Sequence, residues 1–235
     1  MPARRDAIAA RNNAEWCAAV WKAHGLTVGQ RHGLWFCAEE TPQFYPNVVT
    51  VDPAADPDLQ VAFIRSLVER SDFEFSVKDS FASLPLATAG LTPLFSATWL
   101  WLEPGDPPPL QEGTSWRRID AAELMRWERA WRGDEEADGR VFPDRLLDDD
   151  QVHVIGGFDS QGQIVAGAIA YRTADAIGLT NVFGSQGQVI AALTSLLPPA
   201  PVVAYQPGED LSQARRRGFL PLGPLTVWRS THNGR

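Results

Sequence analysis

The sequence has few cysteines: Cys17 and Cys37 are the only two among 235 residues. Two thiols cannot build a disulfide scaffold, and no stretch with the pattern of a signal peptide precedes them, so we expect a cytoplasmic protein. The chain also lacks an apolar run near the roughly 20 residues that a membrane helix needs. The longest candidate, Leu94–Leu102, is interrupted by Ser96 and Thr98. We therefore expect no membrane partner.

Positive charge is scarce as well. The chain has 21 Lys and Arg against 29 Asp and Glu, which gives a formal net charge of −8. Nucleic-acid binding needs a positive surface that displaces counterions from phosphates, so we expect no nucleic-acid partner. The one basic triplet, Arg215–Arg217, precedes Gly218 at the expected end of a helix, where cations complement the helix dipole.

The sequence lacks the residue patterns that several kinds of metal-binding and catalytic site require. No paired Cys or His spacing for zinc is present, and Asp148–Asp150 lacks the alternating oxygen spacing of a calcium loop, so no metal site is expected. The chain also has no Walker loop and no Gly-x-Ser-x-Gly elbow.

The composition that remains is that of a globular protein. Hydrophobic residues make up 44% of the chain and charged residues 21%, so a sizeable core can be buried. The nine Trp are unusually many. Large rings contribute most where surfaces are buried, so we expect them to fill cores and the seam between the halves.

A repeated block is the most informative pattern. Gly218-Phe219-Leu220-Pro221-Leu222 with Thr226 has a counterpart in Gly90-Leu91-Thr92-Pro93-Leu94 with Thr98, at an offset of 218 − 90 = 128 residues. An apolar strand and a short helix precede both blocks, and a strand with Trp99 or Trp228 follows. A period this long indicates two copies of a domain rather than a solenoid.

The sequence therefore predicts two tandem domains, residues 1–104 and 114–235, separated by the proline-rich linker Glu103–Pro109. The expected order in the first is helix, strand pair, strand, helix, strand, helix and strand: Asp6–His24, Leu26–Gln30 with Leu34–Glu39, Asn47–Val51, Asp58–Arg70, Phe73–Val77, Phe81–Ala89 and a terminal strand.

The second domain repeats this order with an insertion. We expect a strand Trp116–Ile119, a helix Ala121–Arg132 with a capping box of Asp120 and Glu123, and a loop or broken helix over Gly133–Asp150. Further elements follow: a hairpin of Val152–Phe158 and Ile164–Tyr171, a strand Ile177–Phe183, a helix Gln186–Leu197, a strand Pro201–Tyr205, a helix Leu211–Arg217 and a last strand.

The second domain resembles the GNAT superfamily of N-acetyltransferases over about residues 116–230. The residues that carry the resemblance are the hairpin around Asp159 and Gly162, the strand-loop-helix Leu179–Leu197, and Ala214-Arg215-Arg216-Arg217-Gly218-Phe219. Residues 12–102 resemble the same unit more faintly. The resemblance implies an α/β fold with a mixed sheet, helices on both faces and two splayed central strands that admit acetyl-CoA.

The resemblance also implies where the cofactor lies. A strand that ends in a bulge, followed by a glycine turn and a helix N-terminus, would face the pantetheine arm and the pyrophosphate. The matching residues are Asn181, Val182, Phe183, Gly184, Ser185, Gln186, Gly187 and Gln188. They lack the family's full spacing of Gln or Arg, two residues, Gly, one residue, then Gly or Ala, so a plain strand-to-helix turn stays open. In the first copy, Val51–Asp58 has no glycine and three carboxylates, so we expect no CoA there.

No catalytic residue is assigned. The position of the family's usual acid, a tyrosine, is Ala214 here. Tyr205 and Tyr171 could substitute sterically, and a base could come from His153, Asp175 or Asp210, but each has a structural explanation as a core, turn or capping residue.

Two functions stay open. The first is a GNAT-type acetyltransferase in which acetyl-CoA is attacked directly by an amine, on a small molecule or a peptide, with an N-terminal copy that closes the acceptor cleft or stabilises the dimer-like pair. The second is a non-catalytic tandem GNAT-like protein that binds an acyl-CoA or a protein partner. A homodimer is an open option for either.

Overall fold

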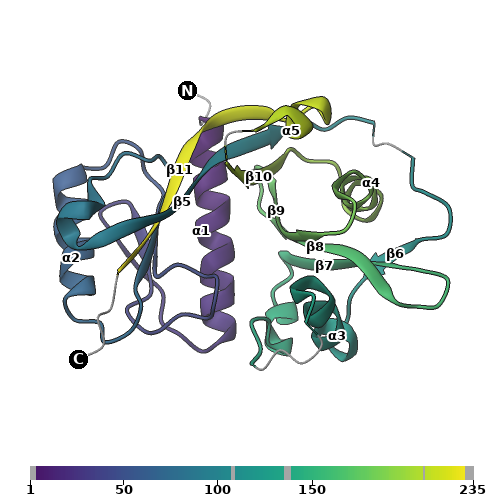
Figure 1. Cartoon of the computed structure of the whole chain (residues 1–235), viewed down its shortest axis with the longest axis horizontal. Coiled ribbons are helices and arrows are strands. Elements are labelled where there is room, and N and C mark those ends of the chain that lie inside the picture. Colours follow the sequence, from purple (N-terminus) through teal and green to yellow (C-terminus); the bar gives the residue numbers. More distant parts are fainter. Residues whose placement is uncertain (1–3, 107–108, 135–138, 209, 231–235) are drawn as a thin grey trace. The chain divides into compact units, whose positions relative to one another are not determined.

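The computed structural model describes residues 4–106, 109–134, 139–208 and 210–230. By internal contacts the chain divides into two units, which are described separately (Figure 1). Unit 1 contains Met1–Trp101 and Tyr205–Arg235, and unit 2 contains Leu102–Ala204. The chain thus returns to unit 1 at its C-terminal end, whereas the sequence predicts a second domain that runs from residue 114 to the end. Pro107 and Pro108 of the predicted linker, and residues 135–138 of the predicted loop, lie outside the described residues.

Unit 1 combines helices with one mixed sheet. Its strands follow the order β1-β2-β3-β4-β11-β5, in which only β3 and β4 run parallel. The elements are α1 (Arg5–Ala23), β1 (Gly29–Arg31), β2 (Leu34–Phe36), β3 (Val48–Thr50), α2 (Pro57–Val68), β4 (Ser76–Asp79), the 3-10 helix η1 (Leu86–Ala89), β5 (Leu91–Leu102), α5 (Ser212–Arg216) and β11 (Leu220–Ser230).

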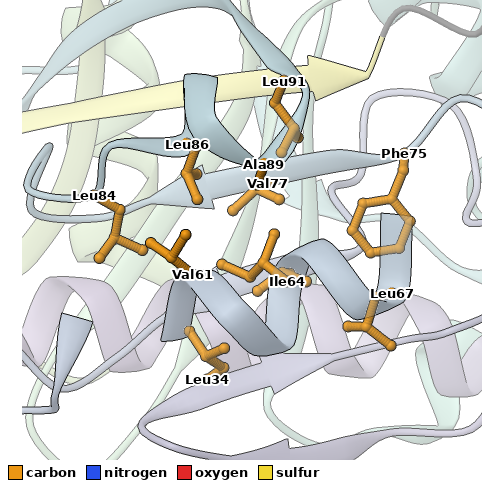
Figure 2. Packing of buried hydrophobic residues seen from close by; sticks show 11 residues of the cluster. Leu34, Val61, Ile64, Leu67, Phe75, Val77, Leu84, Leu86, Ala89 and Leu91 are labelled. Carbon is orange, nitrogen blue, oxygen red and sulfur yellow. The ribbon is translucent and has the colours of Figure 1, made fainter. Parts of the chain in front are cut away.

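The core of unit 1 lies between α2 and the sheet. Val61, Ile64 and Leu67 recur on one face of α2, as the period of an amphipathic helix requires, and all three are buried. Figure 2 shows them beside Phe75 and Val77 of the sheet side. Their removal from water is the main force that holds α2 in place.

The last helix predicted in the first copy, Phe81–Ala89, is mostly wrong. Only the 3-10 turn η1 forms, after Pro85. The preceding residues are a loop because the buried carboxylate of Asp79 accepts hydrogen bonds from the amides of Phe81, at 3.3 Å, and Leu84, at 2.8 Å.

Strand β11 lies between β4 and β5 and runs antiparallel to both. Residue Val227 pairs with Lys78 on one side and with Phe95 on the other. Figure 1 shows β11 and β5 as two long neighbouring strands. The C-terminal strand therefore completes the sheet of unit 1, which is why the two units differ from the predicted domains.

Unit 2 contains a second mixed sheet segment of order β10-β9-β8-β7-β6, in which only β9 and β10 are parallel. Its elements are β6 (Ser115–Arg118), α3 (Ala121–Arg132), the 3-10 helix η2 (Asp144–Asp148), β7 (Val152–Phe158), β8 (Ile164–Arg172), β9 (Ile177–Phe183), α4 (Gln186–Leu196) and the first half of β10 (Val202–Pro207), whose residues from Tyr205 on belong to unit 1. The predicted hairpin, the third strand and both longer helices are confirmed.

The start of α3 differs from its prediction in one detail. The carboxylate of Asp120 accepts a hydrogen bond from the amide of Glu123 at 3.1 Å, as an N-cap should. The Glu123 side chain binds the guanidinium of Arg117 instead of returning to Asp120. The capping box is therefore half formed.

The expected place in cores is confirmed for five of the nine tryptophans, whereas Trp35, Trp116, Trp131 and Trp228 are partly exposed. Trp16, Trp21, Trp99, Trp101 and Trp127 are all buried. Among the residues that the structure describes, no helix has the length and hydropathy to cross a membrane.

Candidate functional site

Strand β9 carries a bulge close to its C-terminal end. Gly167 of β8 pairs with Phe183 and Ile169 pairs with Thr180, so two steps on β8 oppose three on β9. Asn181 has a φ of 52°, a left-handed conformation that Asn tolerates better than most residues. The extra residue leaves main-chain groups of β9 outside the regular ladder.

The pairing of β9 with its parallel neighbour β10 is short. The register contains Ile177 with Val202 and Gly178 with Val203, and no further pair. Beyond Gly178, β9 continues to Phe183 with β8 as its partner in the ladder. This is the arrangement that entry of an extended ligand arm alongside β9 requires.

The glycine after β9 is explained by packing. Gly184 has a φ of 73°, and a Cβ there would lie 2.5 Å from the Cβ of Ala166 and 2.9 Å from the carbonyl oxygen of Val165. Any side chain would collide with β8. The sequence predicts this glycine as an opening for phosphates, but the need for it arises from the neighbouring strand.

Helix α4 begins directly after this turn. Its N-cap is Ser185, whose side chain makes no capping hydrogen bond, and the Ser185 carbonyl accepts from the amide of Val189 at 3.0 Å. Helix geometry leaves the N–H groups of the first turn, which includes Gly187, without acceptors inside the helix. The dipole makes this end attractive to anions.

Gln188, also predicted to touch the cofactor, is engaged in a structural contact. Its Oε1 accepts from the Gln111 amide at 2.7 Å, and its Nε2 donates to the Pro109 carbonyl at 3.2 Å. The side chain therefore holds the segment that leads into unit 2 against the start of α4.

The corresponding turn of unit 1 is built differently. The carboxylate of Asp56 caps α2 and accepts from the amides of Asp58 and Leu59 at 2.9 Å and 3.3 Å. Asp52 likewise accepts from Ala54 at 2.9 Å. Carboxylates already occupy the amides that a phosphate would need.

A pocket of about 600 Å³ opens on unit 2 beside the end of β9. It is lined by parts of α3, the loop after α3, the start of β8 and the end of β9: Arg126, Arg129, Ala130, Gly133, Asp134, Gln163, Ile164, Val165 and Phe183. The Phe183 ring is fixed by an edge contact with Trp127, with centroids 5.5 Å apart. The sequence analysis did not single out the two arginines, although their spacing of three on α3 places them on one helix face.

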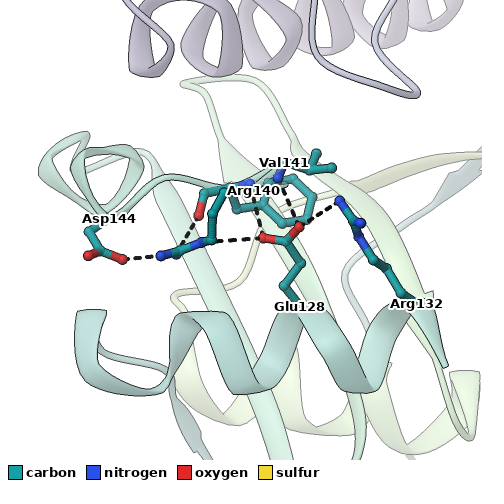
Figure 3. A network of polar contacts seen from close by, with 6 residues as sticks. Glu128, Arg132, Arg140, Val141 and Asp144 are labelled. Atoms are coloured by element: carbon teal, nitrogen blue, oxygen red, sulfur yellow. Dashed lines mark hydrogen bonds and ion pairs between the residues drawn. The ribbon is translucent and has the colours of Figure 1, made fainter. Parts of the chain in front are cut away.

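A buried carboxylate organises the chain after α3. Glu128 is 3% exposed, and its oxygens accept from the amides of Val141 at 2.8 Å and Phe142 at 3.2 Å. The guanidinium of Arg132 lies 2.9 Å away and that of Arg140 3.7 Å away, as Figure 3 shows. A buried charge satisfied in this way fixes the loop end, and the sequence signal for it is the Glu128–Arg132 pair at helical spacing.

Each of the two tyrosines considered as an acid has a structural contact. The Tyr171 hydroxyl donates to Oε1 of Gln151 at 2.9 Å. The Tyr205 ring packs edge-on against Trp99, with centroids 5.6 Å apart, and the Lys78 ammonium lies 4.4 Å from its centroid. Both rings are parts of packed clusters.

The three possible bases have different surroundings. His153 is buried on β7, where burial lowers the pKa of its imidazole, and Arg118 and Arg172 lower it further. Asp175 lies exposed in the turn before β9. The Ser212 amide donates to Asp210 and lowers the pKa of that carboxyl. Within the described ranges the structure contains no cluster of metal ligands.

Comparisons with known proteins agree on the fold. No protein-family model and no curated protein matches the chain. A GCN5-related N-acetyltransferase from Kribbella flavida has a similar structure, with a TM-score of 0.57, 18% identity and coverage of 94% of this chain and 96% of that chain. A GCN5-related N-acetyltransferase from Sphaerobacter thermophilus gives a TM-score of 0.52 and 12% identity over 78% of this chain and 71% of that chain.

A conserved protein of unknown function from Staphylococcus epidermidis is similar to the same degree, with a TM-score of 0.54 and 10% identity over 83% of each chain. At such low identity the likeness establishes the fold. The chain therefore has a mixed α/β fold of the kind found in GNAT acetyltransferases, as the resemblance implies, and its function must be argued from its own residues.

Proposed function

We propose that the chain is an N-acetyltransferase that uses acetyl-CoA, with β9 and the start of α4 as the cofactor-facing part. The observation that supports this most is the end of β9. It combines a bulge at Asn181, a register with β10 of only two residue pairs, and a glycine turn into a helix N-terminus.

The residues present fit a CoA thioester. Main-chain groups of β9 beside the bulge would face the amides of an extended pantetheine arm. The first turn of α4 offers N–H groups and the positive end of the helix dipole to a pyrophosphate. In unit 1 the carboxylate of Asp56 fills the equivalent position, so we assign the thioester to unit 2 alone.

Acetyl-CoA would supply an acetyl group activated as a thioester. A new C–N bond joins the acceptor nitrogen to the acetyl carbon while the C–S bond breaks. The nitrogen loses a proton to water, and a proton from water neutralises the departing thiolate. The chain contributes orientation and main-chain hydrogen bonds, because the residue at the usual acid position is Ala214, which is buried and cannot ionise.

Calorimetric titration with acetyl-CoA tests the proposal. We expect binding to the wild-type chain and loss of at least tenfold in affinity for Gly187→Glu, because a carboxylate in the first turn of α4 repels phosphate. Ala174→Glu adds the same charge in an exposed turn of unit 2 and should bind as the wild type does. No heat of binding for the wild type would refute the enzyme and leave only the fold.

The second candidate is a non-catalytic protein that binds an acyl-CoA or a protein partner. It is favoured by Ala214 and by the engagement of Gln188 with the linker. Release of free CoA thiol during incubation with acetyl-CoA and a panel of amines separates the two functions. Binding without amine-dependent thiol release would favour the second.

We also infer that the two halves are copies of one unit, because the two bulges in the β5–β11 ladder lie at positions related by the sequence offset. Leu220 pairs with Trp101, and shifting both positions by 128 residues exchanges the strands and gives Thr92 with Arg229. That second pair is observed. Any regular antiparallel ladder obeys this relation at any offset, so the evidence for duplication lies in the positions where the ladder is irregular.

The bulges obey the same relation. The ladder skips Leu94 on β5 and Leu222 on β11, and 94 + 128 = 222. Ala97 pairs with Leu225, its own counterpart at that offset, and so marks the centre of the symmetry. A crystal structure with bulges at positions that are not equivalent would contradict the duplication.

A further inference from the structure

The pocket on unit 2 has a lining of mixed charge that the cofactor proposal does not use. Arg126 and Arg129 project from one face of α3, and Asp134 follows in the loop after the helix. Gln163 adds an amide from the start of β8. Cationic and anionic groups thus share one cavity of about 600 Å³.

The two arginines differ in their surroundings. Arg126 donates through Nη2 to the carbonyl of Gly162, which ties its guanidinium to the hairpin turn. Arg129 is exposed, and within the described part of the chain its guanidinium forms no hydrogen bond or ion pair. A planar guanidinium in this setting is suited to a bidentate contact with a carboxylate.

The remaining wall is apolar. Val165 is 46% exposed although it is a β-branched residue in a strand, and it faces the pocket together with Phe183. Phe183 cannot turn away freely, because Trp127 packs against its ring. An apolar group in the pocket would cover surface that now meets water.

We propose that this pocket binds the acetyl acceptor and that the acceptor is a zwitterionic amino acid with an apolar side chain. Arg129 and Arg126 meet its carboxylate, Asp134 faces its ammonium, and Val165 and Phe183 contact its side chain. The proposal rests on the proposed function and specifies its substrate. The reaction is the transfer written above, with the α-nitrogen as the atom that forms the C–N bond.

The charges distinguish this ligand from the phosphates of the cofactor. A phosphate carries only negative charge, so the carboxylate of Asp134 and the apolar wall oppose it. A zwitterion satisfies both signs at once.

Calorimetry with three matched ligand pairs tests the proposal on the full chain. The probes are L-phenylalanine, L-leucine and L-methionine, each compared with the amine that lacks the carboxylate. We expect at least one amino acid to bind roughly tenfold or more tightly than its matched amine. That ratio corresponds to the free energy of about one charge-assisted hydrogen bond. Equal affinity within every pair, or no binding by any amino acid, would overturn the proposal.

Substitutions locate the contact. Arg129→Gln should weaken binding of the amino acid roughly tenfold or more and leave binding of the matched amine unchanged. Arg145→Gln makes the same charge change at an exposed site of unit 2 outside the pocket. It should change neither the affinity for the amino acid nor the affinity for the amine. If both variants bind the amino acid as the wild type does, the pocket is not its site and the proposal fails.

Titration of the same variants with acetyl-CoA separates this proposal from the proposed function. Unchanged acetyl-CoA affinity in Arg129→Gln supports an acceptor pocket. Weakened acetyl-CoA affinity would assign the arginines to cofactor phosphates and overturn the acceptor proposal alone. Amino-acid binding that depends on Arg129, in a chain that does not bind acetyl-CoA, would refute the transferase and leave the pocket as an amino-acid site.

Discussion

His153 couples the protonation of a single side chain to the stability of unit 2. Its imidazole is 9% exposed, and burial together with Arg118 and Arg172 lowers its pKa below the ordinary value of 6.5. In the unfolded chain the same group takes up a proton near pH 6.5. Below that pH the unfolded state therefore binds more protons than the folded state, and stability falls as the pH falls.

We expect the free energy of unfolding to decrease between pH 7 and pH 5, with a slope from this group of at most about 1.4 kcal/mol per pH unit. His153→Gln should remove that part of the slope. Urea unfolding at several pH values measures it, with His24→Gln in unit 1 as the matched variant. An equal effect of both substitutions on the pH dependence would contradict a special role for His153.

Residue types alone indicated some of these roles and missed others. The N-cap contact of Asp120 could be predicted from the sequence, because its partner, the amide of Glu123, lies only three residues further along the chain. The partner of Glu123 could not be predicted, because Arg117 competes for it from β6. Arg126 and Arg129 could be identified as candidate site residues only from the structure, in which β8 and β9 form the opposite wall of a pocket.

The turn between β9 and α4 shows how an element limits its residues. Gly184 and Gly162 have nearly the same positive φ, 73° and 74°, but a Cβ at Gly162 would meet no atom within 4 Å. The two glycines therefore separate the effect of backbone conformation from that of steric collision.

We expect Gly162→Ala to destabilise unit 2 by about 1 kcal/mol, the effect of an unfavourable φ alone. Gly184→Ala should destabilise it by about 2 to 4 kcal/mol, because β8 must also move. Chemical denaturation of the two variants provides the comparison. Equal losses would mean that Ala166 yields easily and that the glycine is not required by packing.

Element prediction succeeded where local pattern and turn chemistry agree. The hairpin β7–β8 follows from two apolar segments around a turn at Asp159, whose carboxylate accepts from the amides of Gln161 and Gln163 at 2.9 Å and 2.8 Å. The bulge in β9 was expected only through the family resemblance. No local residue signal distinguishes Asn181 in a bulge from Asn181 in a regular strand.

At the scale of the whole chain, β11 decides which fragments can fold. It pairs with β4 on one side and β5 on the other. Residues 1–104, one of the two predicted domains, lack this strand and would leave an opening in the sheet of unit 1. Residues 102–204 are contiguous and keep β6 to β9 together.

We therefore expect the fragment 1–104 to show a poorly dispersed amide NMR spectrum and no cooperative thermal transition, because half of the pairing surface of β4 and β5 is missing. The fragment 102–204 should show dispersed amide resonances. A cooperatively folded fragment 1–104 would mean that β11 is dispensable and that the predicted domain boundary describes the folding unit.

The sequence by itself determined the local elements, because periodicity, capping and turn chemistry act between residues close along the chain. It also contains the offset of 128 residues, and its resemblance to a known family implied the mixed α/β class. Only the tertiary structure decided that β11 belongs to unit 1, that Gly184 is needed by β8, and that arginines and an aspartate share a pocket. These depend on burial and pairing between distant segments. Local pattern can make a strand competent to pair, but its partner is chosen by what the assembled sheet leaves unpaired.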